Sequence, residues 1–137
     1  MEHENQSSKA KMGLRWIALL PGALLAAWLA WFLVALLNRI TMRMQGMNPD
    51  SFILKAFVVF ISHAAAGAAF VYVGAKIAPF YNRIVAYGLA GIGLVLAGFM
   101  LFPSILVANY WAIWGGVSLI AGVAGSGYSV IAAETKL

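Results

Sequence analysis

The stretch ISHAAAGAAFVYVG, residues 61–74, decides how the rest of this chain has to fold. Most of its side chains are too small to fill space, so a helix made from it packs well only against close neighbours. At helical spacing, Gly67 and Gly74 lie on one stripe with His63. We therefore place this helix inside a bundle, where its glycines admit a neighbouring backbone.

The composition is that of a membrane protein. Of 137 residues, 64% are hydrophobic and 9% are charged, and the mean hydropathy is +0.91. A soluble domain carries about a quarter charged residues. The net charge of +5 comes from basic residues at the ends of the apolar runs, a pattern that sets topology in the lipid bilayer rather than binding nucleic acid. Cysteine is absent, which excludes disulfides and thiolate sites.

Four apolar runs are each long enough to cross a bilayer. They predict an all-α, polytopic membrane protein with four transmembrane helices in an up-down bundle. The predicted domains are a disordered cytoplasmic tail, 1–13, and a membrane domain, 14–137. The predicted helices cover about 16–37, 52–75, 84–102 and 108–133.

The distribution of basic residues predicts the orientation. If the N-terminus is inside, six Lys and Arg lie on the cytoplasmic side and three on the outer side. The positive-inside rule then favours both termini in the cytoplasm. We expect a multi-pass protein of the cell membrane, the inner membrane of a bacterium.

His63 is the one histidine within a predicted span. An ionisable residue at membrane depth is by default a functional-site hypothesis, because it must find a polar partner. Counting helical rise from the outer end places Ser118 at nearly the same depth, which predicts a hydrogen bond between His63 and Ser118, with Ser62 beside them. A structural role for His63 is favoured over a proton or metal role, since no second ionisable residue shares its depth.

No catalytic set can be assembled. The four carboxylates lie in tails or a loop, away from His63, and no phosphate-binding glycine loop is present. We expect no enzymatic activity, no catalytic residue and no cofactor.

Small residues at helical spacing predict where helices pack. Ala121, Gly125 and Ser129 are the predicted contact if the chain self-associates. The full set of predicted packing residues is Gly67, Gly74, Gly93, Ala97, Ala121, Gly122, Gly125 and Ser129.

A methionine cluster, Met42, Met44 and Met47, follows the first run. Thioether sulfur suits Cu(I), so the cluster is a possible copper site. Methionine is also a flexible apolar filler, and helical spacing with Ile40 explains two of the three residues without a metal.

In length and helix number the chain resembles the small multidrug resistance transporters. Those exporters exchange protons for cationic drugs through an intramembrane carboxylate, and the first run, 16–37, has none. The resemblance therefore implies no transport mechanism here.

These observations favour a non-enzymatic accessory or assembly subunit that packs against itself or a larger membrane complex through Gly and Ala faces. The alternative is an oligomeric transporter or channel component with His63 on its path. A weaker alternative is a copper-handling protein that uses the three methionines.

Overall fold

The computed structural model describes residues 2–48, 50–80 and 82–136, and these residues form an all-α fold without strands. All four helices are long and apolar enough to cross a membrane. Their number and kind agree with the prediction. The helices are α1 (Glu2–Met44), α2 (Phe52–Ile77), α3 (Asn82–Leu106) and α4 (Tyr110–Thr135).

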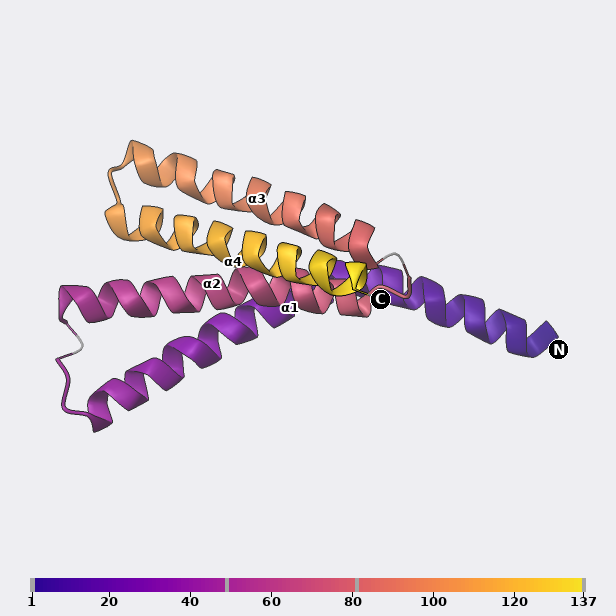
Figure 1. Ribbon diagram of the computed structural model, residues 1–137, viewed down its shortest axis with the longest axis horizontal. Coiled ribbons are helices and arrows are strands. Elements are labelled where there is room, and N and C mark those ends of the chain that lie inside the picture. The colour runs from indigo at the N-terminus through magenta and orange to yellow at the C-terminus, as the bar shows by residue number, and fades with distance from the viewer. Residues whose placement is uncertain (1, 49, 81, 137) are drawn as a thin grey trace.

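Successive helices run in opposite directions, and α2 lies at the centre (Figure 1). It contacts each of the other three helices, and α3 also packs against α4. Within the described ranges, the α1 backbone comes close to α2 alone, and the two helices separate towards Met44. The bundle is therefore not a closed ring: α2, α3 and α4 form a three-helix body, and α1 leans against it.

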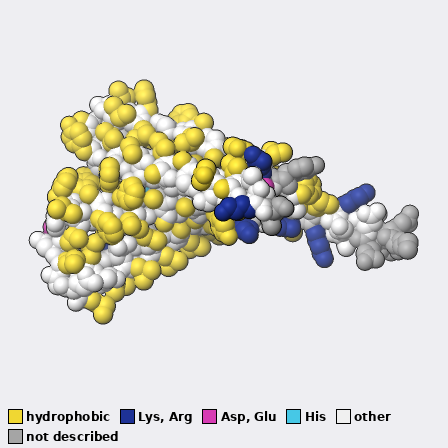
Figure 2. Space-filling model, in the orientation of Figure 1, with side chains coloured by type: hydrophobic (Ala, Val, Ile, Leu, Met, Phe, Trp, Pro, Cys, Tyr) yellow, Lys and Arg dark blue, Asp and Glu magenta, His cyan; other side chains and the backbone are white. Residues whose placement is uncertain are grey.

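Because α1 leans away, an apolar hollow of 350 Å³ lies between the helices. Each helix contributes side chains to its wall, among them Leu24, Phe70, Phe99 and Val123. The outer surface is also apolar, and on the face shown in Figure 2 the Lys and Arg side chains gather at the end that holds both termini. This arrangement suits a body surrounded by hydrocarbon with its charges at the membrane surface.

The prediction of a disordered tail at 1–13 is wrong for the residues that the structure describes. Helix α1 begins at Glu2 and continues for 43 residues, about 64 Å at 1.5 Å per residue, against a hydrocarbon core of about 30 Å. Residues 2–12 contain neither Gly nor Pro and include several good helix formers. Once the membrane span has nucleated a helix, nothing in this segment stops it, and Figure 1 shows it projecting beyond the other helices.

The predicted end of the third helix at about 102 is also wrong, since α3 continues through Pro103 to Leu106. Proline removes one helical hydrogen bond, a loss that membrane helices tolerate. The helix ends where Ala108 adopts a φ of +52°, with its N–H donating to Ile105 O and the Asn109 N–H donating to Ser104 O. The Asn109 side chain then caps α4 by accepting from Ala112 N at 3.2 Å.

The backbones of α2 and α4 come into direct contact. A Cβ built on Gly67 would lie 2.9 Å from Val123 N, and one built on Gly122 would overlap the carbonyl of Ala64. Two side chains of α4 donate across the same interface: Trp114 Nε1 to Ala56 O at 2.9 Å and Ser126 Oγ to Ala68 O at 3.0 Å. Close packing and interhelical hydrogen bonds hold membrane helices together, because lipid supplies little hydrophobic driving force between them.

Arg15 fixes α1 against the C-terminal end of α2. Its Nε donates to Ile77 O at 3.0 Å and its Nη2 to Lys76 O at 3.4 Å, which satisfies carbonyls that have no helical partner. Further along the contact, the Ile77 side chain lies against Gly22, and Ala23 lies against Gly74. The α1–α2 contact is therefore tightest at the end that carries the termini.

Two glycines of α4 three residues apart provide a test of this packing. Gly122→Ala should destabilise the fold by about 2 kcal/mol or more, because the new methyl group meets the Ala64 backbone, which cannot move aside. Gly125→Ala should be neutral or stabilise by about 0.5–1 kcal/mol, because no atom of the described residues lies within 4 Å and alanine favours the helix. Unfolding in mixed micelles of SDS and a mild detergent measures both, and equal costs would contradict this packing.

Candidate functional site

His63 lies where α1, α2 and α4 come together. Its Nδ1 is 2.8 Å from Val59 O, one turn earlier on α2. Because a carbonyl only accepts, the neutral ring that makes this bond carries its proton on Nδ1 and leaves Nε2 as an acceptor. The Nε2 edge faces Gly115 of α4, where an added Cβ would be 3.1 Å away. Trp31 of α1 meets the ring edge-on, with centroids 6.3 Å apart.

The predicted hydrogen bond between His63 and Ser118 is wrong. Ser118 is fully buried, and its hydroxyl donates to Trp114 O at 2.7 Å, within α4. The estimate of depth was close, because the ring packs on Gly115, less than one turn before Ser118. The predicted direction of the two side chains is wrong, because His63 and Ser118 each bond the carbonyl four residues earlier in their own helix.

Ser62, unlike His63, has a side chain without a hydrogen-bond partner in the described structure. It is 1% exposed, and its Oγ has no hydrogen-bond partner among the residues that the structure describes. Burying a hydroxyl without a partner costs about 1–3 kcal/mol. Serine at this position is therefore not explained by the packing of the chain alone.

No cluster of three His, Asp or Glu side chains occurs within the described part of the chain. The methionines of the possible copper site face different surroundings, since Met42 is 8% exposed and Met44 is 83% exposed. Gly46 has a φ of +67°, and the Met47 N–H donates to Met42 O, a helix ending in which the residues at the positions of Met42 and Met47 commonly pack together.

The predicted packing residues divide into two groups. Those in the first are buried between helices: Gly67, Gly74, Gly93, Ala97 and Gly122. Those in the second, Ala121, Gly125 and Ser129, are exposed and line an open groove of 740 Å³ between α2 and α4. The sequence pattern does not give the rotation of α4, which buries Gly122 and leaves Ala121, Gly125 and Ser129 exposed.

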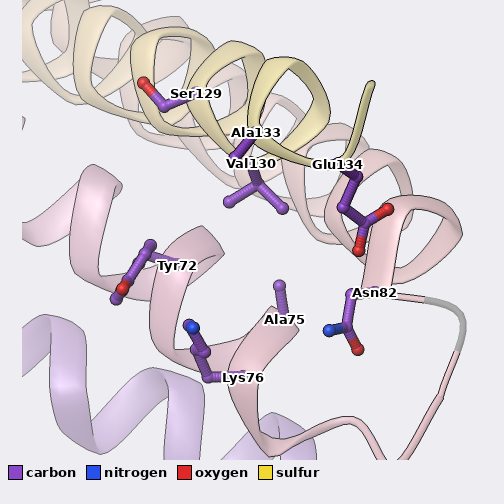
Figure 3. Close-up of a pocket in the computed structure, with 8 residues that line it drawn as sticks. All are labelled: Tyr72, Ala75, Lys76, Asn82, Ser129, Val130, Ala133 and Glu134. Carbon is purple, nitrogen blue, oxygen red and sulfur yellow. The ribbon is translucent and has the colours of Figure 1, made fainter. Parts of the chain in front are cut away.

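A polar hollow at the end that carries the termini was not anticipated. It has a volume of 320 Å³, and Lys76, Asn82 and Glu134 reach it from α2, α3 and α4. Figure 3 shows the Lys76 ammonium next to Tyr72 on one side and the Glu134 carboxylate above Asn82 on the other. The Lys76 Nζ is 5.5 Å from the centroid of the Tyr72 ring. Lys76, Asn82 and Glu134 are each typical polar residues near the end of a helix, so no local pattern in the sequence indicates the hollow.

The opposite end carries an aromatic cluster. Trp111 packs against Phe52 at a centroid distance of 5.4 Å and beneath the Lys55 ammonium at 5.5 Å. Phe60 packs against Trp114 at 5.8 Å. Aromatic rings beside a lysine are typical of the membrane interface, where the rings stay in the apolar region and the charge reaches water.

Comparisons of the chain with known protein families, with curated proteins and with solved structures gave no match.

The geometry around His63 predicts a pattern of energetic coupling. His63→Ala and Ser118→Ala should have additive effects on the free energy of unfolding, within about 0.5 kcal/mol, because the two side chains share no bond. Gly115→Ala should cost less when His63 is also alanine, since the ring that its Cβ meets at 3.1 Å is then gone.

Double-mutant cycles measured by SDS-induced unfolding give both couplings. A larger coupling between positions 63 and 118 than between positions 63 and 115 would contradict the contacts described here.

Proposed function

We propose that this protein is a non-enzymatic accessory subunit of the cell membrane that associates with further copies of itself through the outer face of α3. The observation that carries the proposal is a set of glycines on that face, Gly88, Gly91 and Gly98. Among the described residues, no atom of another helix lies within 4 Å of a Cβ built on any of the three.

The outer face of α3 has the spacing of a helix-helix contact. Its exposed positions recur at intervals of four and three residues, the repeat of a left-handed helix pair. Val95 and Phe102 border a shallow hollow of 310 Å³ around Gly98, into which a side chain of a second helix fits. The positions on this face are Ile84, Gly88, Gly91, Val95, Gly98 and Phe102.

The other glycines of the membrane helices support this assignment. Gly67, Gly74, Gly93, Gly116 and Gly122 each lie against an atom of another helix. Glycine in a helix costs about 1 kcal/mol relative to alanine, and in a membrane it offers lipid almost no surface. A set of glycines that no other helix of the described structure contacts is best explained by a second chain.

The α4 stripe of Ala121, Gly125 and Ser129 is the other open face and remains a possible contact. It lies in the groove between α2 and α4, with Phe60 and Tyr72 also on the wall. A partner helix has to enter this groove to reach Gly125, whereas the α3 glycines lie on an outer face that needs no such entry. We therefore assign the contact between subunits to α3.

One observation favours the alternative, a transporter or channel component with His63 on its path. The buried Ser62 hydroxyl next to His63 lacks a partner within the described residues, and a transported polar species could supply one. Against it, the described contacts of His63 are with a carbonyl, an indole ring and a glycine, none of which titrates. The copper alternative has no comparable support, since Met44 faces away from Met42.

The proposed orientation has both termini in the cytoplasm. Six of the nine Lys and Arg lie at the ends of the helices that are on the side of the termini. Because the number of helices is even, both termini lie on the same side.

Single cysteines at Ser8, Gln45 and Thr135 test the orientation, since the chain has no other cysteine. A membrane-impermeant thiol reagent applied to intact cells should label position 45 and leave positions 8 and 135 unlabelled until the cells are opened. If position 8 or 135 is labelled and position 45 is protected, the protein has the opposite orientation in the membrane.

Gly91→Leu should weaken self-association about tenfold, because the leucine side chain keeps the helix of the second subunit from approaching α3 closely. Energy transfer between labelled subunits, measured over a series of protein-to-lipid ratios in vesicles, gives the dissociation constant. Gly125→Leu, the same change on the open face of α4, is the matched control and should leave the constant unchanged. If Gly125→Leu alone weakens self-association, the contact lies on α4 and not on α3. A wild-type chain that stays monomeric at every protein-to-lipid ratio would refute the proposal.

A further inference from the structure

The polar hollow of Figure 3 and the groove between α2 and α4 form one continuous depression. Tyr72 and Ser129 line both of them. The polar hollow lies at the helix ends that carry the termini, at the level where lipid headgroups lie. The groove runs from there towards the middle of the bundle.

The groove has the dimensions of an acyl chain. Along α2 it extends from Tyr72 to Phe60, which is about 18 Å at 1.5 Å per residue, close to the depth of one leaflet of a hydrocarbon core about 30 Å thick. Its floor is made of the smallest side chains of the two helices, with a ring at each end. The floor residues are Ala64, Ala65, Ala68, Ala69, Ala121, Gly122 and Gly125.

The hollow presents both signs of charge. Lys76 supplies an ammonium, and Glu134, which is half-buried, supplies a carboxylate. No ion pair between them occurs in the described structure, so neither charge neutralises the other, although the Lys76 ammonium lies over the Tyr72 ring. The Asn82 Oδ1 atom is buried, so a ligand in the hollow reaches the Glu134 carboxylate and not this oxygen.

We propose that this depression binds one phospholipid with a zwitterionic, primary-amine headgroup, that is, a phosphatidylethanolamine. The phosphate lies at Lys76, the ammonium donates to Glu134, and one acyl chain occupies the groove. This inference concerns a face of the molecule that the proposed contact on α3 does not use.

The donor and acceptor pattern distinguishes this lipid from the common alternatives. A phosphatidylcholine has the same two charges, but its quaternary nitrogen has no N–H to donate to the Glu134 carboxylate. A phosphatidylglycerol carries the same phosphate but no ammonium, so its headgroup leaves the Glu134 carboxylate without an opposite charge. The site therefore selects a primary amine over a quaternary amine, and a zwitterion over an anion.

Native mass spectrometry of the full-length protein tests the proposal. The protein, extracted in mild detergent and delipidated, is incubated with equimolar phosphatidylethanolamine, phosphatidylcholine and phosphatidylglycerol, and the bound lipid is identified. We expect one phosphatidylethanolamine per chain. Free phosphoethanolamine in excess should displace little of it, because it cannot occupy the groove; full displacement, or equal retention of all three lipids, would overturn the proposal.

Two variants test the two parts of the site. Glu134→Gln should lower the retention of phosphatidylethanolamine about tenfold, as expected for loss of a charge-assisted hydrogen bond, while Asp50→Asn, at the opposite end of α2, should not. Gly125→Leu should fill the groove and displace the lipid, while Gly91→Leu on α3 should not. Helicity and thermal unfolding check that each variant folds, and unchanged retention in both site variants would contradict the assignment.

The outcome is independent of the proposed self-association. Gly91→Leu changes the energy transfer between subunits and not the bound lipid, whereas Glu134→Gln changes the bound lipid and not the energy transfer. Failure of one proposal is therefore distinguishable from failure of the other.

Discussion

The contact between the α2 and α4 backbones is the interaction on which the rest of the structure depends. It exists because Gly67 and Gly122 carry no side chain where the helices meet, so that carbonyls and Cα atoms touch directly. In a bilayer, helices gain little by hiding apolar side chains from lipid, and close packing is the main source of specific attraction. Once α2 and α4 are in contact, Trp114 and Ser126 reach carbonyls of α2, and His63 is held against Gly115.

Most of the fold could be predicted from the sequence, because a membrane span requires a long apolar run and the chain has four. The residues at which the helices begin and end could not be predicted. Residues 2–12 are polar, but polarity does not prevent a helix that a span has already nucleated, and Pro103 removes one bond without ending α3. Signals that mark the ends of soluble helices are weaker where the membrane penalises any unpaired backbone group.

The candidate site was harder to predict, because it depends on how each helix is rotated about its axis. The depth of His63 follows from counting residues, but the direction of its ring follows from contacts with Trp31 and Gly115. Serine and histidine in helices can bond the carbonyl four residues earlier, so a polar pair at one depth need not face each other. The polar hollow combines Lys76 with Glu134, 58 positions further along the chain, and no local pattern links them.

The open angle between α1 and α2 has a consequence for the surrounding bilayer. Arg15 holds the two helices together near the termini, and they diverge towards Met44 and Phe52 (Figure 1). Across a membrane, such an outline is a wedge, which occupies more area in the leaflet that holds the diverging ends than in the other. Lipids next to it have to tilt or crowd to fill the difference, and several copies assembled with the same orientation would bend the membrane towards the narrower side. The divergence of α1 from α2 would thus connect the packing of one small protein to the curvature of the bilayer in which it lies.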